Sequence, residues 1–199
     1  LQRMQGVWHE RGVVSEGDGF AWQDRLTELR PPVDIEGEHD YLTEIHSQAE
    51  AFIASLAERL LAGKGGAAFF LDYGFPEGEY FHPQRHMGTV MCHQLHQADD
   101  NPLVAVGQKD ITAHVNFTGV ALAAQNAGLQ VLGYASQAWF LLNLGLAERM
   151  AQASLAERSQ AQRLVNEHEM GELFKVMGFA TSADWAAQGF VRGDRSHRL

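Results

Sequence analysis

The sequence predicts a mixed α/β fold, and three observations support this. An unbroken apolar run from Ala67 to Leu71 has the length of a β-strand and follows a helical pattern. Apolar runs at 129–134 and 173–179 alternate with further helical patterns. The first thirty residues have the pattern of an antiparallel ribbon. We therefore expect one α/β domain, with a core at 41–199 and a β-hairpin inserted at 1–30.

The hairpin is predicted from a turn sequence between two strand-like runs. One strand runs from Gly6 to Val14, and the chain returns through Phe20 and Trp22. The intervening Ser-Glu-Gly-Asp-Gly contains Asp-Gly, which is a hairpin signal because glycine accepts a positive φ. The two prolines at 31–32 then stop regular structure, and an acidic stretch to residue 40 predicts an exposed connection.

The Ala67 strand is predicted to be central and buried on both faces, because its apolar run does not alternate. A helix is expected before it at 41–62, where apolar residues recur at helical spacing, with Gly63 as its C-cap. Asp72, Tyr73 and Gly74 come directly after the apolar run. Open α/β sheets bind ligands beyond the carboxyl ends of their strands, so we expect one side of a site here.

The segment at 75–108 lacks periodicity and is predicted to be a long loop that serves as a lid or binding loop. Beyond it the pattern returns. The predicted elements are a helix capped by Asn116 or Thr118 and closed by Gly128, a strand at 129–134, a short helix at 136–144, a long helix at 147–168 and a strand at 173–179. The tail beyond Trp185 is weakly specified.

Composition excludes several classes of protein. The formal net charge of −10 repels nucleic-acid backbones and anionic bilayers, and it suits a cationic partner. No long apolar run predicts membrane insertion. Cys92 is the single cysteine, so no intrachain disulfide can form, as is typical of a reducing compartment.

The loop residues also raise two other chemistries. Cys92, His93 and His96, with other histidines at 82, 86 and 114, offer metal ligands, but their spacing matches neither structural zinc sites nor zinc peptidases. A hydrolase using Cys92 as nucleophile lacks an orienting third group, and there is no nucleophile elbow. The sequence also contains no Walker A or dinucleotide-binding glycine motif. The polar candidates that remain are Asp72, Tyr73, Glu79, Arg85, Thr89, His93, Asp110, Thr112, His114 and Gln137.

Several motifs in a fixed order give a more specific signal. FFLDYGFPEGEYFHPQR, GTVMCHQLHQADDNPL, GQKDITAHVNFTGVA, GLQVLGYASQAWFLLNLGLAER and MGELFKVMGF follow one another between residues 67 and 179. In this order they resemble the carboxyl-terminal half of the MidA family. Members are S-adenosylmethionine-dependent methyltransferases, and the mitochondrial ones are protein arginine methyltransferases that assist assembly of respiratory complex I.

The resemblance implies a Rossmann-like class I methyltransferase fold, with the Ala67 strand as a parallel central strand and the 129–134 and 173–179 strands as a reversed edge. It also implies that the chain is about half of a longer protein, because the glycine-rich cofactor loop lies in the family's amino-terminal half. With that loop outside these residues, most of the S-adenosylmethionine pocket would lie outside them too. The sequence also departs from the family at one position, because Asn116 stands where the family more usually has an acid.

Methyl transfer is an in-line displacement, so the enzyme mainly aligns the nucleophile and excludes water. A cationic guanidinium substrate is best held by carboxylates, for which we name Asp72, Glu79 and Asp110. Tyr73 and Gln137 would orient the substrate, and His93 would accept a proton. Gly74 and Thr89 are the expected cofactor contacts, and no residue is assigned to a metal.

The expected partner is a protein substrate with a cationic side chain, and a respiratory complex I subunit is one candidate. The expected location is the bacterial cytoplasm, or the mitochondrion in a eukaryote. The alternatives are a non-enzymatic assembly or interaction module and, less favoured, a metal-dependent hydrolase that uses the loop histidines.

Overall fold

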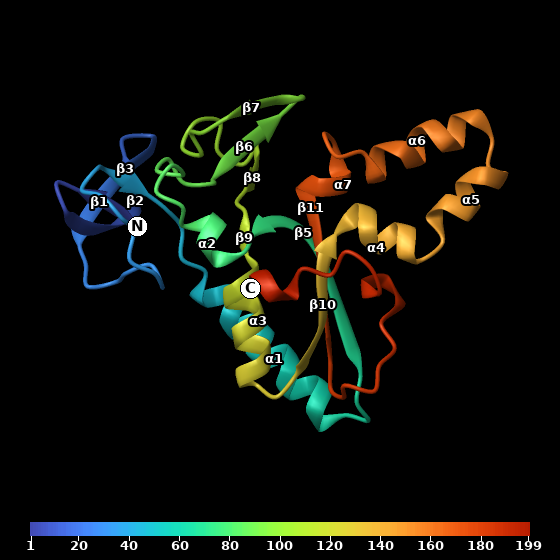
Figure 1. The fold of residues 1–199 in the computed structure, drawn as a ribbon. Coiled ribbons are helices and arrows are strands. Elements are labelled where there is room, and N and C mark those ends of the chain that lie inside the picture. The colour runs from blue at the N-terminus through green and yellow to red at the C-terminus, as the bar shows by residue number, and fades with distance from the viewer. The chain divides into compact units, whose positions relative to one another are not determined.

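The computed structural model describes residues 1–199, which divide into two compact units. The first unit contains residues 1–45 and 77–114, and the second contains residues 46–76 and 115–199. Each unit is therefore built from two separate stretches of sequence (Figure 1). None of the helices is both long enough and apolar enough to cross a membrane.

The predicted hairpin is confirmed in the first unit. Strands β2 (Val7–Glu16) and β3 (Gly19–Leu26) pair antiparallel down to Glu16 opposite Gly19, which leaves a turn of two residues. Gly17 has a φ of 58°, a conformation that glycine accepts without strain. Two short strands, β1 (Gln2–Met4) and β4 (Tyr41–Leu42), complete an antiparallel sheet in the order β3-β2-β1-β4.

The predicted long loop at 75–108 is interrupted by short elements of regular structure. This region begins with the short helix α2 (Glu77–Tyr80) and continues into a three-stranded antiparallel sheet. Its strands are β6 (Met91–Gln94), β7 (Gln97–Asp99) and β8 (Asp110–Thr112). The sequence signal fails because the β6–β7 turn uses Leu95 and His96 at positive φ, where hairpins of this kind usually have Asn and Gly.

The second unit contains a mixed four-stranded sheet in the order β10-β11-β5-β9. Its strands are β5 (Ala67–Phe75), β9 (Val115–Asn116), β10 (Gln130–Ser136) and β11 (Phe174–Ala180). Strand β11 runs antiparallel to both of its neighbours, β5 and β10. The expectation of two reversed edge strands is thus corrected, because β11 alone is reversed and it lies inside the sheet.

Strand β5 also differs from the prediction. It continues to Phe75, so Asp72, Tyr73 and Gly74 lie within the strand rather than beyond it. It is not buried on both faces, since Phe69 is 43% exposed and Leu71 is 50% exposed. The reason is its outer edge: β9 pairs only with Gly74 and Phe75, and no strand pairs with residues 67–73 on that side.

The helices follow the predicted capping signals with two corrections. Helix α3 (Phe117–Asn126) is capped by Asn116, and α4 (Gln137–Asn143) by Ser136. Helix α1 (Ser47–Ala62) begins later than expected because Tyr41 and Leu42 pair with β1 instead. The predicted long helix is two helices, α5 (Leu146–Gln152) and α6 (Leu155–Val165), because Ser154 forms a capping box with Glu157. The remaining helices are α7 (Met170–Leu173) and the 3₁₀ turns η1 (Gln188–Phe190) and η2 (Ser196–Arg198).

The sheet of the second unit has an apolar layer on each face. On one face, Ile53 of α1 and Phe117 of α3 pack with Met177 of β11. On the other face, Phe190 of the carboxyl-terminal tail packs with Ala135 and Val176. The tail that sequence patterns left weakly specified is therefore part of the core.

Candidate functional site

The carboxyl end of β5 carries the first group of predicted site residues. Asp72 is exposed, and one of its carboxylate oxygens accepts a hydrogen bond of 2.8 Å from the Tyr73 amide. The ring of Tyr73 packs edge-on against Phe174, with 5.4 Å between the ring centroids. Gly74 is in close contact with β9, since a Cβ there would lie 2.1 Å from the Val115 carbonyl oxygen. The close approach of the β9 backbone is therefore enough by itself to require glycine at position 74.

Gln137 lies at the same end of the sheet as Asp72. In sheet register Asp72 lies opposite Lys175, and Lys175 lies opposite Ser136, which directly precedes Gln137. The Gln137 side chain is buried, and its Nε2 donates a hydrogen bond of 2.8 Å to the Leu164 carbonyl. This hydrogen bond connects α4 to α6, so the Gln137 amide nitrogen is used in holding the two helices together.

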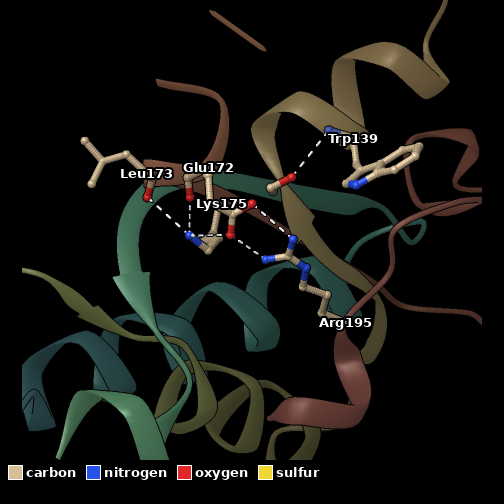
Figure 2. Close-up of polar contacts among 6 residues, drawn as sticks. Trp139, Glu172, Leu173, Lys175 and Arg195 are labelled. Carbon is tan, nitrogen blue, oxygen red and sulfur yellow. Dashed lines mark hydrogen bonds and ion pairs between the residues drawn. The ribbon is translucent and has the colours of Figure 1, made fainter. Parts of the chain in front are cut away.

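Glu172, Lys175 and Arg195 form a cluster of charged residues that was not predicted from the sequence (Figure 2). Lys175 of this cluster is the residue that lies between Asp72 and Ser136 in the sheet register. Arg195 donates to the Glu172 carboxylate, with an Nη2–Oε2 distance of 3.0 Å. The buried Lys175 ammonium donates to the Glu172 carbonyl and lies 3.6 Å from its carboxylate. Burial opposes ionisation of Glu172, but Arg195 and Lys175 outweigh it and lower the pKa of this carboxyl. The cluster attaches the carboxyl-terminal tail to β11.

Thr89 belongs to a hydrogen-bond network in the first unit that is centred on Glu44. The Glu44 carboxylate accepts hydrogen bonds from the Thr89 amide at 3.0 Å, the Thr89 hydroxyl at 2.8 Å and the Tyr80 hydroxyl at 3.1 Å. The Thr89 oxygen in turn accepts from the His114 amide at 3.0 Å. The Thr89 hydroxyl is therefore fully used within the unit.

Two features show that this network is fixed. Burial first, and then the Glu44 charge, raise the pKa of the Tyr80 phenol, so it keeps its proton and donates at neutral pH. Gly88 has a φ of +73°, and a Cβ there would lie 2.6 Å from a Glu44 oxygen. Sequence patterns missed Glu44 because they placed this residue inside the predicted helix at 41–62.

His93 and Asp110 are brought together by the three-stranded sheet. They are register partners on β6 and β8, and both are exposed. Directly opposed residues share one face of a sheet, so an imidazole and a carboxylate lie side by side here. Glu79, another candidate, lies on α2 and is half-buried.

The histidines of this region do not assemble a metal centre in the structure. No group of three or more His, Cys, Asp or Glu side chains is placed to hold a metal ion. The Cys92 thiol is fully buried in the three-stranded sheet. Neither a metal-dependent nor a thiol-dependent hydrolase gains support from this geometry.

Comparison with known proteins gives the family. Residues 1–135 match the model of a family described as "Putative S-adenosyl-L-methionine-dependent methyltransferase". The chain belongs to this family. The resemblance to MidA-type methyltransferases inferred from the motifs is thereby confirmed, and the cofactor of the family is S-adenosylmethionine.

Two solved structures from Burkholderia thailandensis are close relatives in fold. One is an uncharacterised protein with 41% identity and a TM-score of 0.88, covering 99% of this chain and 55% of the other. The second was solved with S-adenosyl-homocysteine and has 40% identity and a TM-score of 0.86, covering 99% of this chain and 53% of the other. A Drosophila melanogaster protein named mitochondrial protein arginine methyltransferase NDUFAF7 homolog is 29% identical over 89% of this chain and 43% of its own length. The chain thus spans about half the length of the relatives it matches.

Two of the expected cofactor contacts are already occupied within the chain. The space beside Gly74 is filled by the Val115 backbone, and the Thr89 hydroxyl is held by Glu44 and His114. No glycine-rich phosphate-type loop occurs in the sequence.

Proposed function

We propose that this chain is the carboxyl-terminal half of an S-adenosylmethionine-dependent protein arginine methyltransferase. The match of residues 1–135 to the methyltransferase family carries the proposal. The arginine and protein specificity is supported by the Drosophila relative alone, at 29% identity. A subunit of respiratory complex I is one candidate substrate, and the bacterial cytoplasm is the proposed location.

The open edge of β5 supports the half-protein part of the proposal. Residues 67–73 have no strand partner on that side, and the strand carries two partly exposed apolar side chains, Phe69 and Leu71. Phe52 on α1, which packs edge-on to Phe70, is 59% exposed. An unpaired apolar strand in a sheet is a template for another strand. We propose that a strand from the rest of the protein, carrying the main cofactor loop, pairs with this edge.

The proposed substrate site uses carboxylates for the cationic guanidinium. Asp72 of the second unit is one candidate carboxylate for the donor-only guanidinium, and Glu79 and Asp110 of the first unit are separate candidates. Each would keep electron density on the attacking nitrogen. His93, which faces Asp110 across the strands, would accept the proton released on methyl transfer. Tyr73 would orient the substrate. Gln137, Gly74 and Thr89 have the structural contacts described above, so they are left out of the proposed site.

A methyl-transfer assay tests this proposal. The chain, extended at its amino terminus to the length of its relatives, is incubated with radiolabelled S-adenosylmethionine and extract of its own cells. Asp72→Asn and Asp110→Asn should each lower labelling by at least about tenfold, which corresponds to roughly 1.4 kcal/mol of transition-state stabilisation. Glu167→Gln, at an exposed position, is the matched control. Labelling within a few-fold of the parent removes the substituted residue from the site.

The second candidate is a non-enzymatic interaction module, which is favoured by the lack of a glycine-rich cofactor loop in this sequence. The same assay separates the two proposals. An extended protein that transfers no methyl group to any protein, yet folds, would support the interaction module.

A further inference from the structure

Near its turn, the β2–β3 hairpin is a ribbon of only two strands. Strand β1 pairs with residues 7–9 of β2 and no further. From Gly12 to the turn, β2 pairs with β3 alone, and β3 is the edge of the sheet. Every second residue of an edge strand directs its backbone N–H and C=O outward, where they can pair with another strand. Two-stranded ribbons are marginally stable alone, so this ribbon would gain from a third strand.

One face of this ribbon carries an apolar stripe. Val13 lies opposite Trp22, and Phe20 is two residues before Trp22 on the same strand, so all three side chains share a face. Their exposed fractions are 51%, 43% and 48%, in the order Val13, Trp22, Phe20. Three large apolar side chains in a row on an isolated ribbon indicate a surface that another protein covers.

The stripe is held in place by an ion pair at one end. The Arg11 guanidinium lies 5.3 Å from the Trp22 ring centroid, and its Nε is 3.0 Å from the Asp24 carboxylate. Cation–π contact on one side limits the motion of the indole. A pre-ordered aromatic side chain loses little entropy when a partner binds to it.

Unpaired negative charge lies at the other end, by the turn. Glu16 and Asp18 are exposed and belong to no ion pair, whereas the basic residues of the ribbon, Arg11 and Arg25, are already paired with Asp24 and Glu10. Glu16 precedes the turn, and Phe20 follows it by two residues. Because Ser15 lies opposite Phe20 and Glu16 lies opposite Gly19, Glu16 and the stripe are on opposite faces at the same end of the ribbon. The alternating side chains of one added strand would reach both faces.

We propose that the outer edge of β3 binds an extended segment of the methyl-acceptor protein as an added strand. Its apolar side chain covers Phe20 and Trp22, and its arginine or lysine pairs with Glu16 and Asp18. This inference rests on the proposed function for the identity of the partner. A second copy of the chain fits less well, because the cations of the ribbon, Arg11 and Arg25, are already paired and offer no free charge to these carboxylates.

Binding of designed peptides to the whole chain tests the inference. The probe is a nine-residue peptide of alternating arginine and valine, compared with a glutamate–valine peptide of the same length. Calorimetric titration should show binding of the arginine peptide and at least about tenfold weaker binding of the glutamate peptide. An arginine peptide with alternate backbone amides methylated should also lose binding, because it cannot form the added ladder.

Variants locate the surface. Phe20→Ser with Trp22→Ser should weaken the arginine peptide about tenfold or more, and Glu16→Gln with Asp18→Asn should flatten its salt dependence. Leu155→Ser, which removes an 84% exposed leucine from α6, should change nothing. Amide NMR spectra confirm that each variant is folded.

Three results would overturn the inference. These are equal affinity for both peptides, unchanged affinity in the Phe20/Trp22 variant, and a dimer in sedimentation that this variant dissociates, which would assign the stripe to a second copy. Because peptide binding needs no methyl donor, it is separable from the assay above. Methyl transfer without peptide binding would refute this inference alone. Peptide binding without methyl transfer would refute the proposed function and the identity of the partner, and would leave the peptide-binding edge of β3.

Discussion

The ring of Phe190 occupies the space that Gly133 leaves on the surface of the sheet. A Cβ on Gly133 would lie 2.3 Å from Cγ of Phe190. A Cβ on Gly178, which lies directly opposite on β11, would be 2.9 Å from Cε2 of the same ring. Phe190 also stacks on Phe69 with 6.3 Å between the ring centroids. The tail is therefore fastened to the sheet by an aromatic ring lying over two paired glycines.

Gly133→Ala should destabilise the second unit because the added methyl group displaces Phe190. Overpacking of this kind costs about 1–3 kcal/mol. Phe190→Ala should cost about 3–5 kcal/mol through the cavity that it leaves. Urea denaturation measures both changes. Gly78→Ala, where a Cβ meets no atom within 4 Å, is the control and should cost nothing. A Gly133→Ala protein as stable as the parent would contradict the packing described.

Stability should fall in acid through Glu172. Its pKa is lowered in the folded protein, so its contribution is full above the unfolded value of about 4.5 and is lost as pH falls through the folded value. Since Glu172 is partly solvent-exposed, we expect a contribution below about 1 kcal/mol. Arg195→Gln should reduce this pH dependence, as measured by urea midpoints at pH 7 and pH 4. Arg163→Gln, which affects a more exposed pair with Glu169, should leave it unchanged.

Glu44→Gln should destabilise the first unit more than its small change in volume suggests. The substitution places an amide donor where Thr89 and Tyr80 both donate, and it leaves a donor without an acceptor. The expected loss is about 1–3 kcal/mol. Tyr80→Phe removes one donor and should cost less. Thermal unfolding followed by circular dichroism ranks the two, and the reverse order would show that Glu44 is not the centre of the network.

Substitutions in the β6–β7 turn should increase the stability of the protein. Leu95 and His96 have φ values of 49° and 65°, and side chains at positive φ cost about 1–2 kcal/mol each relative to glycine. Leu95→Asn combined with His96→Gly should therefore raise the unfolding free energy by about 1–2 kcal/mol. Leu95→Ala keeps the strained backbone and should give no gain. A stabilised alanine variant would show that exposed leucine, not backbone strain, sets the cost.

Local signals in the sequence predicted the elements that depend on them. The Asp-Gly turn located the first hairpin, Asn116 and Ser136 marked two helix starts, and the apolar run located β5. The three-stranded sheet was missed because its turn carries Leu95 and His96 rather than turn residues. The order of strands β10, β11 and β5 depends on long-range pairing, which no local pattern encodes.

The structure brings two of the predicted site residues together and shows structural partners for others. Strand-end polarity and the family resemblance named Asp72, His93 and Asp110, and the structure places the last two opposite each other. Glu44 was missed because its importance arises from donors that lie about 36–46 residues away in sequence. Gln137 and Thr89 have structural partners that only the coordinates reveal.

The central claim is that the methyl donor is held mainly by polypeptide outside these residues. Calorimetric titration of S-adenosylmethionine into this chain tests it, with the Burkholderia thailandensis relative that was solved with S-adenosyl-homocysteine as the positive control. We predict no measurable heat of binding for this chain and clear saturation for the relative. Saturable binding by this chain alone, at an affinity similar to that of the relative, would contradict the claim.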